Sequence, residues 1–389
     1  MSDSDSGDRT STRRSVIAAT GASIVGLSGC LGGSGGSADS AGGGGGYGGG
    51  GGGGTTTGTV ESSAPFRNKT LRVSTWSGTN ATVFEEELKP AYEEKTGGTL
   101  EVVPGWSEIL AKIRAAPADD PPYDLTVTGH RQHYIGVQSG LWEPIDVAGL
   151  ENSDVIKPEL LREDPISVPL AYGVMCYAYD EAAIGFQPET WADLTTEAED
   201  VALPGSYFTN ALMMASIVSD AMAFDDELYD PEGHDAIFEV LRSIDISTFY
   251  TGAQDMWTSI SQGVANLGQY FFAYSLKKSR DTDSMDIGLH VPERTTGYVD
   301  DYHLVRGTER AAMAEDFLDF MLTTEMQTTY AESFNMGMVN PETEYPEATR
   351  ENVPLSNEAL EDVVFLEFAE MAEYAESLNE RFNELKSTV

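Results

Sequence analysis

The chain has 389 residues, with 64 acidic and 23 basic side chains and a formal net charge of −41. A hydrophobic fraction of 40% is enough for packed cores, so the acidity does not indicate disorder, and the length suggests about two domains. Nucleic acid is excluded as a partner, because the sequence has no basic cluster to meet phosphate groups. Acid spread along the whole chain is typical of proteins that work in very high salt, where charge repulsion is screened. We therefore expect a halophilic protein.

The N-terminal segment has the features of an export signal. The pair Arg13-Arg14 precedes a short apolar run, Val16 to Leu27, as in signals of the twin-arginine route. This run holds about a dozen residues, whereas a membrane-spanning helix needs roughly 20. The Leu-Ser-Gly-Cys motif at its end resembles the lipobox of secreted lipoproteins. We therefore predict that residues 1–29 are cleaved and that Cys30 carries a lipid anchor at the extracellular face of the membrane.

A tether follows the predicted lipid site. Residues 30–65 are dominated by Gly, Ser and Thr, a composition that buries too little apolar area to offset the entropy lost on folding. If Cys30 carries a lipid, Cys176 has no partner, because the chain has only these two cysteines. We expect Cys176 to be a small buried hydrophobic residue.

The folded part begins near Lys69 with alternating strands and helices. Asn80 is placed to cap the first helix, which carries apolar residues from Val83 to Tyr92 on one face. Short links between the elements predict a parallel sheet with covering helices. The expected strands are 71–76, 100–103 and 123–127, and the expected helices are 80–96, 107–115 and 132–140.

The same pattern continues to the C-terminus. Thr324 and Gln327 have the spacing of a capping box, and the last helix has a stripe of apolar residues from Tyr374 to Leu385. The expected strands are 172–179, 201–203, 264–268, 287–291 and 298–305. The expected helices are 210–223, 231–243, one around residues 314–321, one after residue 324, and one around residues 374–385.

The sequence offers no catalytic centre. It contains no zinc-protease helix motif, no phosphate-binding loop, and no serine or cysteine nucleophile in a credible turn. The five histidines are scattered, and only His130 and His133 share a local spacing. That spacing favours side chains that face solvent or ligand over a metal pair. We expect no enzyme activity, no metal and no cofactor.

Two places have the features of a binding site. Trp76 and Ser77 follow the first strand, and open α/β sheets bind ligands at the carboxyl ends of their strands. Trp76 could instead be a core aromatic residue. Asp300 lies in a run that mixes acids and aromatic residues, where a ligand contact and a solvated acid both remain open.

The order of several segments resembles one known family. These segments are the first strand ending in Trp76, Lys89–Glu93, Thr96–Gly97, Tyr123–Leu125, Val168–Gly173, Thr190–Leu194, Gln262–Gly268 and Asn335–Asn340. Together they are similar to the spermidine/putrescine-type extracellular solute-binding proteins that serve ABC importers.

The resemblance implies a two-lobed α/β fold of the type II periplasmic-binding-protein kind, each lobe a mostly parallel sheet covered by helices. Lobe 1 would comprise residues 66–171 with 297–345, and lobe 2 residues 172–296 with 346–389. The chain would cross between lobes near residues 169–173 and 292–298. A monomer would capture a small solute, such as a polyamine, and deliver it to an ABC permease.

The resemblance also implies the site residues. Trp76 matches an aromatic residue after the first strand, Asp300 matches an acid after the second crossing, and Tyr270 matches an aromatic of the second lobe. Further candidates for ligand contact are Ser77, His130, Arg131, Tyr207, Tyr298 and Asp301.

One departure leaves the ligand open. The acid-bearing turn of polyamine binders reads Leu203 to Asn210 here, with Tyr207 and no carboxylate. A closed cleft does not tolerate an unpaired ammonium, so either the ligand has fewer charges than spermidine or acids such as Asp255 and Asp301 substitute. Because of Arg131, an anionic ligand remains an alternative, as do thiamine and a metal chelate. A secreted hydrolase and a structural surface protein are the remaining alternatives.

Overall fold

The computed structural model describes residues 65–162, 166–219, 226–282 and 284–389. The predicted signal at Arg13-Arg14, the predicted lipid site at Cys30 and the predicted tether lie outside these residues. Among the helices that are described, none is long and apolar enough to cross a membrane.

The described strands join into one mixed sheet with twelve strands. Its main path runs β2-β1-β3-β10-β5-β8-β6-β7. The strands are β1 (Thr70–Trp76), β2 (Thr99–Gly105), β3 (Leu125–Thr128), β4 (Trp142–Glu143), β5 (Val168–Asp180), β6 (Val201–Pro204), β7 (Ile246–Tyr250), β8 (Leu267–Phe271), β9 (Ile287–His290), β10 (Thr295–Val305), β11 (Gly337–Met338) and β12 (Val363–Phe365).

Helices lie between many of the strands along the chain, singly or in groups of two or three. They are α1 (Thr79–Val83), α2 (Lys89–Thr96), α3 (Ile109–Ala115), α4 (His130–Gln138), α5 (Asp193–Thr196), α6 (Phe208–Ser219), α7 (Asp226–Tyr229), α8 (His234–Ser243), α9 (Ala253–Ser261), α10 (Phe272–Asp281), α11 (Ala311–Met321), α12 (Thr324–Phe334), α13 (Glu347–Asn352), α14 (Asn357–Leu360), α15 (Phe368–Met371) and α16 (Ala375–Lys386). A π-helical turn, η1 (Phe84–Leu88), joins α1 to α2, and short 3-10 turns lie at η2 (Val147–Gly149), η3 (Ser153–Val155) and η4 (Pro158–Leu160).

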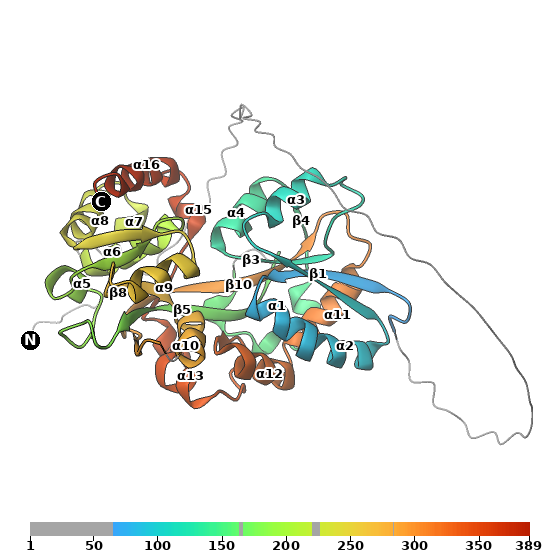
Figure 1. The fold of residues 1–389 in the computed structure, drawn as a ribbon. Helices are drawn as coiled ribbons and strands as arrows, with labels where there is room; N and C mark the ends of the chain where they lie inside the picture. Colours follow the sequence, from blue (N-terminus) through green and yellow to red (C-terminus); the bar gives the residue numbers. More distant parts are fainter. Residues whose placement is uncertain (1–64, 163–165, 220–225, 283) are drawn as a thin grey trace, which may run out of the picture. The chain divides into compact units, whose positions relative to one another are not determined.

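Two long strands connect two smaller parallel sets. β1 pairs in parallel with β2 and β3, and β6 pairs in parallel with β7 and β8. Between these sets β5 and β10 run antiparallel and side by side (Figure 1). β10 pairs onward with β3, and β5 pairs onward with β8. Parallel strands with covering helices are the predicted fold class, which is confirmed. The predicted crossing segments fall on β5 and β10, and the lobe bounds stay a prediction.

Each parallel set has its own hydrophobic core. One core is built on β1, β2, β3 and α11, and the other on β6, α6, α8 and α16. β5 contributes to both cores, because Tyr172, Val174 and Cys176 pack in the first while Met175 and Tyr177 pack in the second. The expectation for Cys176 is confirmed, since it is a free thiol that is fully buried. Burial raises the pKa of this thiol to about 12.

Two predicted helix caps are wrong. Gly78 stands at the N-cap of α1, and Asn80 is fully buried, where its amide accepts from Thr75 Oγ1 and donates to Tyr330 Oη. The N-cap of α12 is Thr323, whose hydroxyl accepts from the Met326 amide, one residue before the predicted position. In the first case a tertiary hydrogen-bond network outcompetes the local cap, which the spacing of residue types cannot indicate. Asn80-Ala81-Thr82 also has the sequence of an N-glycosylation acceptor, and the buried Asn80 amide leaves no room for a glycan.

Candidate functional site

Two tryptophans stand at one edge of the parallel set of β1 and β2. Trp76 is the last residue of β1 and Trp106 comes directly after β2. The two strands are paired in parallel with Trp76 opposite Gly105, so both tryptophans lie at the carboxyl ends. Their rings meet edge to face, with centroids 5.0 Å apart. Sequence reasoning found Trp76 and missed Trp106, although the same rule applied to the second strand would have found it.

Trp76 contacts the acid that the resemblance pairs with it. Its indole Nε1 donates a hydrogen bond of 2.8 Å to Asp300 Oδ1, across 224 positions of sequence. The second oxygen, Oδ2, is buried and has no hydrogen-bond partner among the described residues. Burial raises the pKa of Asp300 to about 7, while the Trp76 hydrogen bond opposes the shift and the charge of Asp301 adds to it. Asp300 is therefore a buried acid with one unused acceptor.

The negative charge of this acid acts on two phenols. Burial, followed by the negative charge of Asp300, raises the pKa of both Tyr274 and Tyr298. The hydroxyl of Tyr298 is also buried without a partner among the described residues. Its ring lies against Gly173 of β5, where an added Cβ would come within 2.3 Å of the ring. The sequence of β5 thus leaves space for Tyr298 beside Asp300.

A contact joins these residues to the other parallel set. Trp106 Nε1 donates a hydrogen bond to the hydroxyl of Tyr207, which follows β6. Both side chains are more than a third exposed, at 36% and 37%. Tyr270 of β8 is buried against Tyr250 and Trp257, and its pKa is raised by burial and then by Tyr207. Tyr207 of the second parallel set is therefore linked through Trp106 to Trp76, whereas Tyr270 packs against residues of its own set.

The other predicted residues lie elsewhere. Asp301 is fully buried and pairs with Arg162, whose Nη2 lies 2.7 Å from Oδ2, and it also accepts from Ser167. Arg162 Nη2 lies 3.1 Å from His130 Nδ1, so His130 faces this buried pair. His130 is buried, so the expectation that it faces solvent is wrong, and its ligand contact stays a prediction. The sequence analysis missed Arg162, because no spacing rule connects it to β10.

Three remaining candidates are exposed. Ser77 donates to the carbonyl of Gly105, which ties the ends of β1 and β2 together. Arg131 is exposed on α4. Asp255 lies in the first turn of α9 and accepts from the backbone and hydroxyl of Thr251. None of these three contacts Asp300 in the structure.

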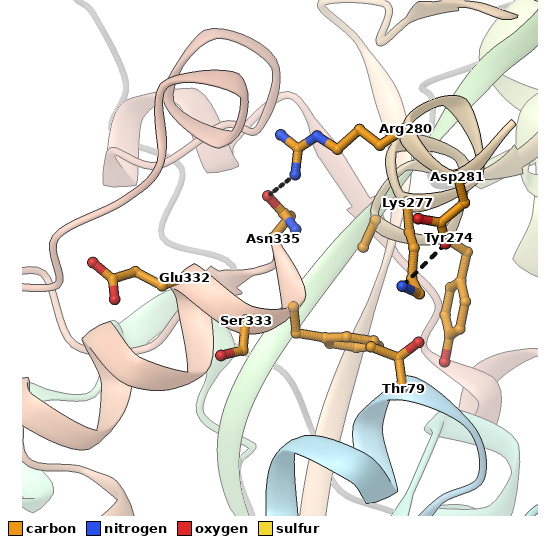
Figure 2. Close-up of a pocket in the computed structure, with 10 residues that line it drawn as sticks. Thr79, Tyr274, Lys277, Arg280, Asp281, Glu332, Ser333 and Asn335 are labelled. Atoms are coloured by element: carbon orange, nitrogen blue, oxygen red, sulfur yellow. Dashed lines mark hydrogen bonds and ion pairs between the residues drawn. The ribbon is translucent and has the colours of Figure 1, made fainter. Parts of the chain in front are cut away.

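A pocket of about 150 Å³ shares one wall with the aromatic site. Tyr274 lines this pocket together with Thr79, Lys277, Arg280 and Asn335 (Figure 2). Arg280 donates to the Asn335 side chain over 3.4 Å, and Lys277 pairs with Asp281 at 3.1 Å. Across the described residues, no group of three or more His, Cys, Asp or Glu side chains could hold a metal ion.

Comparison with known proteins identifies the family. A family model described as "Bacterial extracellular solute-binding protein" matches residues 87–354, which is more than half of the chain. The chain belongs to this family. Members are substrate-binding proteins of ABC transporters and not enzymes, so this solute-binding protein is exported, binds a small molecule and delivers it to a permease.

Individual relatives agree on fold and differ in ligand. The γ-aminobutyric acid-binding protein of Pseudomonas aeruginosa is 23% identical over 339 residues, covering 83% of this chain and 92% of that protein. The spermidine/putrescine substrate-binding protein PotD of Streptococcus pneumoniae superposes with a TM-score of 0.69 at 18% identity, over 82% of this chain and 100% of its own. An ABC transporter protein of Clostridium perfringens gives 0.67 at 19% identity, over 81% and 99%. These structures support the two-lobed fold of this solute-binding protein.

Proposed function

We propose that the solute is a small organic cation, such as a polyamine, and that Asp300 holds its ammonium group. The observation that carries this proposal is the buried Oδ2 of Asp300, which has no partner among the described residues. A buried acceptor without a donor is unfavourable, and an ammonium supplies both the missing hydrogen bond and the opposite charge. Trp76 and Tyr298 offer ring faces to a cation, a contact of about 0.5–2 kcal/mol.

We further propose that binding closes two lobes around the solute. Lobe 1 would comprise residues 66–171 with 297–345, and lobe 2 residues 172–296 with 346–389, so that β5 and β10 carry the hinge. The hydrogen bond from Trp106 to Tyr207 joins the two proposed lobes beside Asp300. A solute that contacts both lobes favours the closed state by its differential affinity for it, which the permease can then recognise.

An ω-amino acid is a second candidate. Within the described part of the chain, Asp301 and Asp255 are already engaged elsewhere, so Asp300 supplies one free carboxylate for one ammonium group. The pocket behind Tyr274 holds Arg280 and Lys277, cations that suit a carboxylate at the other end of a ligand. The relative from Pseudomonas aeruginosa is named for a ligand of this kind.

Calorimetry on the purified protein tests both candidates. Putrescine, spermidine and γ-aminobutyrate would be titrated into the wild type, Asp300→Asn and Asp255→Asn. Asp255→Asn removes the same charge from an exposed helix end and serves as the matched control. A cation or amino acid should lose affinity in Asp300→Asn alone. Equal affinity in all three proteins would place the site away from Asp300, and tighter binding in Asp300→Asn would indicate an anion.

We propose that Cys30 carries a lipid that anchors the protein outside the cell membrane. The Leu-Ser-Gly-Cys motif supports this proposal, and lipid attachment requires the thiol. Cys30→Ser should appear in the medium or remain unprocessed when membrane and medium fractions are compared by blotting. A Ser variant that stays in the membrane with unchanged processing would contradict the lipid anchor.

We propose export by the twin-arginine route, on the basis of Arg13-Arg14 before the short apolar run. Replacing both arginines with lysine keeps the charge and should leave precursor inside the cell. Export of that variant at the wild-type rate would rule the route out.

The net charge of −41 supports a monomer that works in very high salt, and its melting temperature should rise as KCl is added.

A further inference from the structure

A second pocket lies beside β11, which pairs with the crossing strand β5, and it shares only Glu332 with the lining of the first pocket. Its volume is about 590 Å³, within the range of small-molecule sites. Pro341, Pro346, Leu355 and the ring of Tyr345 form an apolar wall, and Lys157 and Arg350 also line it. The described residues thus surround a space large enough for a small organic molecule.

Lys157 is the unusual member of this lining. It is only 3% exposed, and its Nζ donates one hydrogen bond of 2.6 Å to the carbonyl of Met338 in β11. The ammonium also lies 5.8 Å from the centre of the Tyr172 ring. No carboxylate of the described residues lies within ion-pair distance of it. A buried lysine normally has a counter-charge, because burial without one is costly.

The charged residues around Lys157 do not act as its counter-charge. Glu159, two residues along the chain, raises the pKa of Lys157, but burial outweighs it and lowers this pKa to about 8. Glu332 and Glu344 are exposed in the same lining, as is Arg350. The phenol of Tyr345 is engaged with the backbone of Met338. The one charged group that is buried in this pocket is therefore a cation.

We propose that this pocket binds a small organic monoanion, whose carboxylate meets Lys157 and whose apolar body lies on the proline and leucine wall. Arg350 adds a second cation for the anion, while Glu332 and Glu344 disfavour ligands with more negative charge. The site is separate from the solute site at Asp300, and the inference does not depend on which solute binds there. Its place against β11, which pairs with β5 at Tyr172, puts it beside a crossing strand.

Calorimetry with sodium benzoate on the whole mature protein tests the proposal, at fixed chloride concentration and ionic strength. Benzoate should bind saturably to the wild type. Lys157→Met should weaken it at least tenfold, because a charge-assisted hydrogen bond is lost. Lys112→Met removes an exposed lysine that lines neither pocket and is the matched control, which should bind benzoate as the wild type does.

Proton uptake gives a second measurement that a merely structural lysine would not produce. An anion stabilises the ammonium form, so binding at pH 8.5 should take up about 0.7 of a proton when the free pKa is about 8. At pH 6.5 the uptake should vanish, since Lys157 is already charged. Titrations in two buffers of different ionisation enthalpy measure this number.

Several results would overturn the proposal. They are absence of saturable benzoate binding, equal binding in Lys157→Met, and no proton uptake at pH 8.5. Chloride or phosphate binding at Lys157 with no benzoate binding would also overturn the organic-anion assignment. If Lys157→Met fails to fold, Arg350→Gln at the rim should weaken benzoate several-fold, and the wild-type proton uptake still decides.

Discussion

Asp300 and Asp301 are neighbours in β10, both are buried, and their surroundings are opposite. Asp301 holds Arg162 through two nitrogens and accepts from Ser167. Asp300 accepts from Trp76 through Oδ1 and leaves Oδ2 without a partner among the described residues. Successive side chains of a strand point to opposite faces, so the two carboxyl groups serve different sides of the sheet. The register with β5 also shifts between these two residues.

The comparison teaches which buried acid is available for binding. Asp301 has its counter-charge within the protein, so a ligand would have to displace Arg162 to reach it. Asp300 has a pKa raised to about 7, because burial penalises its charge more than the single indole hydrogen bond relieves it. A buried acid that is left partly unsatisfied indicates a partner that arrives from outside.

The largest effect should come from breaking the satisfied acid. Asp301→Asn leaves the Arg162 guanidinium, whose side chain is 15% exposed, without its counter-charge. Loss of one partner of a buried pair costs about 3–5 kcal/mol, so the free energy of unfolding should fall by that amount in a denaturant titration. Asp235→Asn is the control, because its pair with Arg381 is on the surface and should cost less than about 1 kcal/mol. Equal losses in both variants would show that Asp301 is no more satisfied than a surface acid.

Replacing Asp300, the acid with an oxygen unpaired among the described residues, should leave the stability of the protein unchanged or raise it. Asp300→Asn abolishes a buried charge, so we expect the ligand-free protein to unfold at the same or a higher denaturant concentration. A cationic ligand should bind about ten- to a hundredfold more weakly, because one charge-assisted hydrogen bond is lost. Denaturant unfolding and calorimetry on one preparation measure both quantities. A variant that loses stability and keeps its affinity would reverse the roles assigned to the two aspartates.

The sequence predicted both acids as ligand contacts and could not separate them, and in the structure Asp300 lies beside Trp76 while Asp301 pairs with Arg162. Trp76 and Asp300 are 224 positions apart, and their contact follows from the order of parallel strands and crossing strands in the resembling family. The partner of Asp301 is Arg162, which precedes β5 in an irregular segment with no period or spacing rule. Local patterns predict elements and edges, whereas the pairing of buried charges depends on tertiary packing.

The same limit explains Asn80 but not Trp106. Trp106 could have been predicted, because it directly follows β2, the parallel strand next to the one that ends at Trp76. Asn80 has the residue type and place of a cap, and its amide is bonded to Thr75 and Tyr330 in the core instead. Residue type alone cannot tell a cap from a buried network.

The next largest expected effect is the pH dependence of stability and ligand affinity that Asp300 causes. The folded pKa of Asp300, about 7, lies above its ordinary value of 3.8. Its contribution to stability is therefore present at low pH and is lost as the pH rises from about 4 to 7 in the ligand-free protein. Cation binding needs the ionised form, so affinity should fall about tenfold from pH 8 to pH 6. Calorimetry at several pH values measures it, and Asp300→Asn should abolish the dependence. A flat profile in the wild type would contradict a raised pKa at the site.

The smallest effect should come from the contact that joins the two proposed lobes beside Asp300. Tyr207→Phe keeps the ring and removes the hydroxyl that accepts from Trp106 Nε1. One neutral hydrogen bond is worth about 0.5–1.5 kcal/mol, so affinity for the solute should fall about two- to tenfold through faster dissociation. Trp106→Phe should cost a similar amount, and the double variant should cost no more than the single ones if the two groups act through this bond. Stopped-flow dissociation rates measure the cycle. Additive losses would show that each ring contacts the solute separately. Unchanged dissociation rates would show that the bond does not hold the closed state. In that case Trp76 and Asp300 would be the residues that retain the solute.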